Sequence, residues 1–126
     1  MKMLSLVTLA CLSAPAVAAP PASTITVHGA DPVAVAAIQQ GDLARAEAIL
    51  NDGRLDANDP VRLINLGDVY WLAGRQRDAI SAWRRALASP NQYDVETAGG
   101  RFLPTYVIAR EALALHGQPM QTASSN

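Results

Sequence analysis

One internal recurrence constrains this chain more than any other feature: two segments match in register at a fixed offset of 33. Gly74 follows Gly41 at this offset, and Trp83 falls where Leu50 stands in the earlier segment. Ala79 likewise falls opposite an earlier alanine. A fixed period of this length is typical of folds built from stacked, repeated helical units.

Start and stop signals predict helices on this pattern. Asp31 with Pro32, and Asp59 with Pro60, each open a helix. The aspartate accepts from free backbone N–H groups, and proline loses nothing at the first helical position. Glycine ends a helix cheaply in the left-handed conformation. The expected helices span residues 32–40, 43–51, 61–73, 76–88 and 104–116.

Residues 89–103 contain proline, asparagine and two adjacent glycines, so we expect a loop there. Gly117 follows Gly74 at an offset of 43 rather than 33, which sets the last helix apart from the period. That helix is either the first of a third repeat or a cap. We favour the cap, because the open end of a repeat array exposes apolar surface. Residues 118–126 form a polar tail.

Residues 1–18 have the layout of a secretory signal peptide. Lys2 precedes an apolar run of about eleven residues, shorter than the roughly 20 that span a bilayer. Ala16 and Ala18 place small residues at the two positions that a signal peptidase reads. We therefore expect cleavage after Ala18, a mostly flexible leader over residues 19–30 with a weak strand pattern at Ile25 and Val27, and a periplasmic or secreted protein.

The single cysteine, Cys11, lies inside the apolar run, and Thr8 stands where a lipoprotein signal has leucine. A lipid anchor is therefore not expected. After cleavage the chain would hold no cysteine. That composition fits an oxidising compartment and excludes disulfide, thiol and cysteine-ligated metal chemistry.

Charge excludes two classes of partner. The chain holds ten basic and eleven acidic residues, for a net charge of −1. Nucleic-acid binders carry basic patches that neutralise phosphates, and docking on an anionic membrane needs clustered basic charge. We expect neither partner, and no membrane span. One cluster of arginines near the second helix pair is interpreted as a solvated face, the alternative being a patch for an anionic partner: Arg75, Arg77, Arg84 and Arg85.

Small and aromatic residues of the second unit stand at a characteristic spacing: Leu66, Gly67, Tyr70, Gly74, Ala79, Trp83 and Ala86. With this spacing, residues 60–92 resemble a tetratricopeptide repeat. Residues 27–59 resemble a degenerate copy at the same offset. The resemblance implies an all-α fold, a short α-solenoid of antiparallel helix pairs. About two such units and a C-terminal capping helix, 104–116, would form one domain over residues 31–117.

The resemblance also implies a binding function. In this family the first helix of each repeat lines a concave groove that takes an extended peptide or a partner helix. The corresponding residues here are Val61, Ile64, Asn65, Asp68, Trp71 and Leu72. Their mainly apolar character favours a hydrophobic peptide or helix. We expect a non-catalytic protein–protein interaction module of the bacterial periplasm. The alternative is a structural homo-oligomer whose groove is filled by its own chain or by a second copy.

Two of these groove residues need comment. Consecutive helical residues lie about 100° apart, so Trp71 should point away from the seam that Tyr70 fills. It is then either a binding anchor or a residue that packs on the last helix or the leader. Asn65 stands where some repeats of the family bind a peptide's terminal carboxylate. Those repeats also use lysines, which the mature chain lacks, and Asp68 adds negative charge, so carboxylate binding is not expected.

No constellation of residues predicts catalysis. His28 and His116 stand apart in the sequence, and His116 suits the C-terminus of a helix, where a cation is favoured. Four polar residues of one loop lack the spacing of an EF-hand, so they are interpreted as turn and capping residues: Asp52, Asp56, Asn58 and Asp59. We expect no enzyme activity, no cofactor and no metal.

Overall fold

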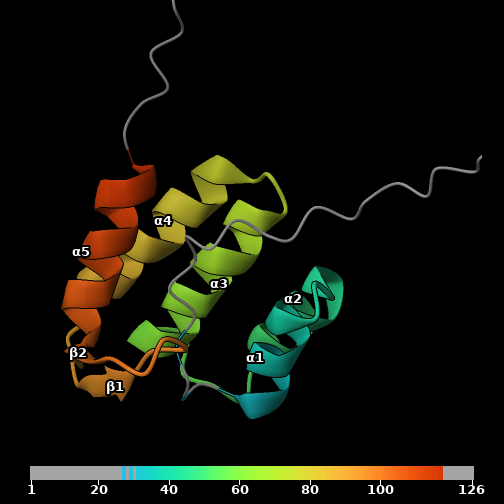
Figure 1. Cartoon of the computed structure of the whole chain (residues 1–126), viewed down its shortest axis with the longest axis horizontal. Helices are drawn as coiled ribbons and strands as arrows, with labels where there is room; N and C mark the ends of the chain where they lie inside the picture. The colour runs from blue at the N-terminus through green and yellow to red at the C-terminus, as the bar shows by residue number, and fades with distance from the viewer. Residues whose placement is uncertain (1–26, 28, 30, 118–126) are drawn as a thin grey trace, which may run out of the picture.

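The computed structural model describes Val27, Gly29 and residues 31–117, and the expected signal peptide, most of the leader and the polar tail lie outside this part. The described chain contains α1 (Pro32–Gln39), α2 (Leu43–Leu50), α3 (Pro60–Leu72), α4 (Gln76–Leu87), β1 (Asp94–Glu96), β2 (Phe102–Pro104) and α5 (Thr105–His116). The fold is all-α, as expected, with one small hairpin. In Figure 1, α1 and α2 form one pair, and α3 lies between that pair and the pair of α4 and α5.

Each expected helix agrees with an observed one to within one residue at both ends. The expectation of a loop over residues 89–103 was wrong, because β1 and most of β2 lie there and pair as antiparallel strands, with Val95 opposite Leu103. Gly100 adopts φ +76 in the turn and donates its N–H to the Thr97 carbonyl at 2.8 Å. Strands of three residues give too little alternation to be recognised from sequence.

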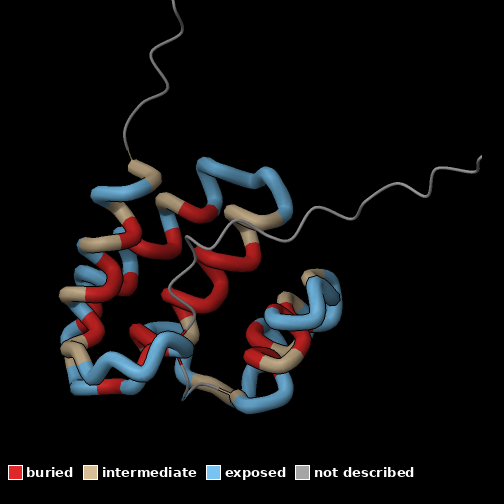
Figure 2. The backbone as a smooth tube through the Cα atoms, in the orientation of Figure 1, coloured by how far each residue is buried: buried red, intermediate tan, exposed pale blue. Residues whose placement is uncertain are grey.

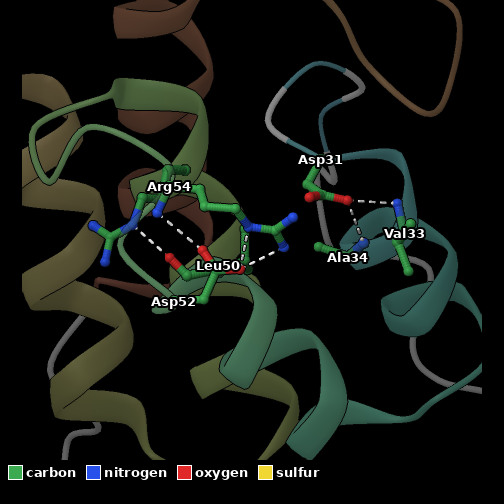
Figure 3. Close-up of polar contacts among 7 residues, drawn as sticks. Asp31, Val33, Ala34, Leu50, Asp52 and Arg54 are labelled. Atoms are coloured by element: carbon green, nitrogen blue, oxygen red, sulfur yellow. Dashed lines mark hydrogen bonds and ion pairs between the residues drawn. The ribbon is translucent and has the colours of Figure 1, made fainter.

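Capping side chains fix where the helices begin. Asp31 accepts from the N–H of Val33 at 2.8 Å and of Ala34 at 3.4 Å (Figure 3). Asp59 accepts from the Arg62 N–H at 2.8 Å at the start of α3. These bonds satisfy backbone donors that have no partner inside the helix. The two Asp-Pro signals in the sequence therefore act as local start points.

The recurrence found in the sequence is visible in the backbone hydrogen bonds. At the end of α1, Gly41 donates to the Ile38 carbonyl at 3.0 Å and Asp42 to the Ala37 carbonyl at 2.9 Å. Both bonds recur at the same offset, at the end of α3, with lengths of 3.0 and 2.8 Å. Gly41 and Gly74 have φ +77 and +78, a conformation that glycine adopts readily. Both helix pairs therefore turn in the same way.

Helix α3 is the centre of the core, and Figure 2 shows it buried along most of its length. On the side of α1 and α2 it shares an apolar cluster formed by Ala34, Ala37, Ile38, Ala46, Leu50, Leu66, Val69 and Ala82. On the side of α5 and the hairpin it shares a second cluster, formed by Val27, Val61, Leu63, Ile64, Ala86, Val95, Ile108 and Ala109. Covered on opposite sides in this way, α3 is buried nearly all round, polar Asn65 and Asp68 included.

Trp83 of α4 packs directly on Gly67 of α3. The indole is fully buried, and its Nε1 donates to the Ile64 carbonyl at 3.3 Å. It also contacts Ala79 and Ala112, so it fills the seam between the second helix pair and α5. The small residue at position 67 is required because the ring occupies the space of a side chain.

Gly67→Ala tests this packing. The added methyl group would overlap the indole, with Trp83 Cε2 only 2.7 Å away. The ring must then leave its buried position, so we expect the free energy of unfolding to fall by about 1–3 kcal/mol in urea denaturation followed by circular dichroism. Gly99→Ala is the matched control, because the nearest atom to a new Cβ there is Thr97 Oγ1 at 3.8 Å. Equal stability of the two variants would contradict the contact.

Candidate functional site

The six residues expected to line a groove all lie on α3, and the structure buries four of them. Val61 and Ile64 are fully buried, and Asn65 and Asp68 are at most 1% exposed. Trp71 and Leu72, at the end of the helix, are half-buried. This face of α3 is therefore covered in the folded chain rather than open to solvent.

Asn65 makes the most informative contact on this face. Its Oδ1 accepts from the Val27 N–H at 2.9 Å, and its Nδ2 donates to the Val27 carbonyl at 3.0 Å. One side-chain amide thus satisfies both backbone groups of a residue in a distant segment, as a neighbouring strand would. The amide is occupied by main-chain groups of the same chain.

Val27 lies in a slot between α3 and the hairpin. It forms an isolated antiparallel bridge with Thr97, and its side chain is fully buried against core residues that include Val61 and Ile64. We call this place the α3 slot and define it by Val61, Ile64, Asn65, Val95 and Thr97. The slot holds an extended backbone by polar contacts and its side chain by apolar ones.

The sequence contained one signal for this role of Val27. Ile25 and Val27 alternate with polar residues in a strand-like pattern, but the surrounding leader was expected to be mostly flexible. Val27 is instead part of the core. Periodicity marks a short extended segment and does not show which helix face it covers.

Aromatic rings meet where α3, α4 and α5 converge. The His116 ring lies 4.2 Å from that of Trp71 and 5.4 Å from that of Trp83, measured between centroids. The two indoles are 6.0 Å apart. Of the two interpretations left open for Trp71, the structure shows packing against the last helix. Sequence reasoning considered His116 only as a partner of the helix dipole, because its neighbours come from other helices.

Side-chain hydrogen bonds attach the hairpin region to the helices. The Thr105 hydroxyl donates to Gln92 Oε1 at 2.5 Å, and Gln92 Nε2 donates to the Ala86 carbonyl at 2.9 Å. The Tyr93 hydroxyl donates to Asp59 Oδ2 at 2.8 Å. Partial burial raises the pKa of Tyr93 well above its usual value, and the bond to Asp59 raises it further. Because these contacts hold β1 in place, they also fix one wall of the α3 slot.

The acidic loop residues are engaged as turn and capping groups. Asp52 forms an ion pair with Arg54 (Figure 3), and hydrogen bonds from Arg54 hold the pKa of Asp52 below its usual value. Asp56 accepts from the Asn58 N–H at 2.8 Å. Among residues 31–117 with Val27 and Gly29, no cluster of three or more metal-ligating side chains is present.

Arg75 links the two helix pairs. Its guanidinium lies 2.9 Å from Glu47 Oε1 on α2 and 2.9 Å from Asp78 Oδ2 on α4. Both hydrogen bonds raise the pKa of Arg75, the one to Glu47 most. Of the four arginines noted in the sequence, this one therefore has a structural role. The other three are exposed on α4, and Arg85 donates to the Ala57 carbonyl at 3.2 Å.

Comparison with known proteins adds no family: no family model, no curated protein and no solved structure matches the chain. Within the described part of the chain, every helix is too short or too polar to cross a membrane.

Asn65→Ala should destabilise the fold. It leaves the N–H and carbonyl of Val27 buried without these partners, and each such group costs about 1–3 kcal/mol. We expect a lower midpoint in urea and faster hydrogen exchange at the Val27 amide. Asn58→Ala is the control, because Asn58 is exposed and its hydrogen bonds use its backbone. Slow exchange retained at Val27 in Asn65→Ala would contradict the contact.

His116→Ala should alter tryptophan fluorescence. The chain contains two tryptophans, and both contact His116, so the emission reports this cluster alone. Removing the ring should expose Trp71, shift the emission to longer wavelength and lower stability by about 0.5–1.5 kcal/mol per aromatic pair. Leu115→Ala is a suitable control, since Leu115 is 60% exposed on the same turn. The same spectrum for both variants would count against the cluster.

Proposed function

We propose that the chain is a non-catalytic protein–protein interaction module of the bacterial periplasm, whose α3 slot binds an extended backbone. The observation that carries this proposal is the pair of hydrogen bonds from Asn65 to both backbone groups of Val27. Because these bonds go to main-chain atoms, the backbone of any extended residue except proline, which lacks the N–H, can form them. Recognition of this kind is the basis of peptide binding by strand addition.

Three further features support the proposal. The resemblance to tetratricopeptide repeats gives α3 the place of a groove-lining helix. The helix-ending bonds that recur from α1 to α3 fit a repeated helical unit. The signal-like segment at residues 1–18 supports export across the inner membrane of a bacterium.

The slot also suggests what a partner segment must contain. The Val27 side chain lies among Val61, Ile64, Val95 and Ile108, so the bound residue is apolar and of about valine size. The chain's own Val27 occupies the place in the folded protein. A tethered segment has a high effective concentration. A partner segment therefore binds when it outcompetes Val27, or when the chain's own Val27 segment is held elsewhere.

The second candidate function is a structural homo-oligomer in which Val27 comes from a second copy. One observation favours it: Gly29, with φ +143, stands between Val27 and the start of α1. This backbone conformation is open to glycine and strained for other residues. A hinge of this kind, next to a strand-like segment, is the arrangement that permits exchange between copies.

Val27→Asp should open the slot, since an unpaired carboxylate is not tolerated in an apolar core. We expect a labelled synthetic peptide of residues 22–30 to bind the Val27→Asp protein and not the parent, measured by fluorescence anisotropy. The peptide with aspartate in place of valine is the matched control. Val27→Ala serves if Val27→Asp does not fold. Absence of peptide binding to a folded, opened variant would contradict the proposal.

The same variant separates the two candidate functions. Cross-linked purification from the native envelope with Val27→Asp should recover a protein that the peptide of residues 22–30 displaces. A parent protein that is dimeric, with Val27→Asp monomeric in sedimentation, would instead support exchange between copies. If the parent is monomeric and the purification recovers no protein that the peptide displaces, both candidate functions are excluded.

A further inference from the structure

An open groove of about 680 Å³ runs along the outer face of α4 towards the end of α5. We call it the arginine groove; it is lined by Arg77, Ile80, Ser81, Arg84, Arg85, Ala88 and Gly117. Its lining includes three arginines and no acidic residue, and Ile80 and Ala88 are its apolar side chains. The groove does not include any residue of the α3 slot, so it is a separate surface.

The positive charge of the arginine groove is not balanced within the described chain. The ion pairs formed there use Arg54, Arg75 and Arg101 instead. Arg85 donates only to a backbone carbonyl, that of Ala57, at 3.2 Å. The groove therefore presents cationic side chains to whatever enters it.

The helix dipole explains part of this arrangement and leaves Arg77 unexplained. Arg84 and Arg85 lie in the last turn of α4, where a cation is favourable. Arg77 lies in the first turn, where the same dipole disfavours a cation. Arg77 and Arg84 line the same groove about two turns apart, and binding of an acidic surface there would offset that cost.

A matching acidic surface lies on the outer face of the hairpin. Val95 points into the core, so its neighbours Asp94 and Glu96 point outward, and both are exposed. Phe102 pairs with Glu96 across the strands and shares that face. At 71% exposure it is the most exposed large apolar side chain of the described residues. Neither carboxylate makes an ion pair within the described chain.

We propose that the arginine groove of one copy binds the outer hairpin face of a second copy. Asp94 and Glu96 stand about 6.8 Å apart along the strand, and Arg77 and Arg84 about 10.5 Å apart along the helix. The long arginine side chains span this difference. Phe102 then covers the apolar floor around Ile80, so charge and apolar surface match together.

The two surfaces belong to one chain but do not meet within it, because Asp94, Glu96 and Phe102 are not among the residues that line its own groove. The contact joins different patches of the two copies, so it is a head-to-tail contact that propagates or closes into a ring. A net charge of only −1 opposes such assembly weakly. An acidic segment of another protein is the competing occupant.

Charge reversal tests the proposal in the mature protein. By sedimentation equilibrium at low salt, the parent should increase in mean mass with concentration, and added salt should reverse this. Arg84→Glu alone and Glu96→Arg alone should each remain monomeric. Their mixture should associate again, because the unchanged hairpin of the first variant complements the unchanged groove of the second, and the two reversed charges also complement each other.

Arg45→Glu is the matched control, because Arg45 is exposed on α2 and its side chain makes no ion pair in the described chain. The Arg45→Glu variant has the same charge change as Arg84→Glu and should associate like the parent. Thermal melts should show that all variants are folded. A parent that is monomeric at every concentration overturns the proposal. Association that persists in each of the two single variants, Arg84→Glu and Glu96→Arg, also overturns it. Loss with Arg84→Glu but not with Glu96→Arg excludes the hairpin and leaves another acidic occupant.

Discussion

Helix α3 is buried on nearly every side, and the rest of the structure is arranged to keep it from water. The first helix pair covers one side, and α4 packs so closely that Trp83 rests on the backbone of Gly67. On the remaining side α5, the hairpin and Val27 complete the cover. Two helix pairs alone would leave this last side of α3 exposed. The hairpin and Val27 are therefore needed to keep α3 buried.

This requirement explains why the sequence predicted some features well and others not at all. Asp31, Asp59, Gly41 and Gly74 act on their own neighbours in the chain, and the helices they bound were predicted to within one residue. The fold class followed from these local signals and the period. The contact between Asn65 and Val27 joins two segments far apart in the chain, and no local pattern records it.

Prediction of the candidate site from the sequence was limited in the same way, because local patterns do not show long-range contacts. The spacing of the α3 residues correctly placed them on one helix but did not show what would cover them. Val61, Ile64 and Asn65 form a face that Val27 of the same chain covers, and Trp71 packs on His116. Sequence can identify a face suited to a peptide. Only the three-dimensional structure shows that Val27, from a distant segment of the same chain, covers this face.

The buried amide of Asn65 limits what can occupy the α3 slot. A leucine at this position would allow the slot to stand empty or to collapse, at the cost of lost packing alone. A buried amide needs both a donor and an acceptor, and leaving it without them is costly. Removal of Val27 therefore requires another extended backbone, or water, in the same place. In the binding proposed for the slot, a partner segment must therefore compete with Val27 for the Asn65 amide.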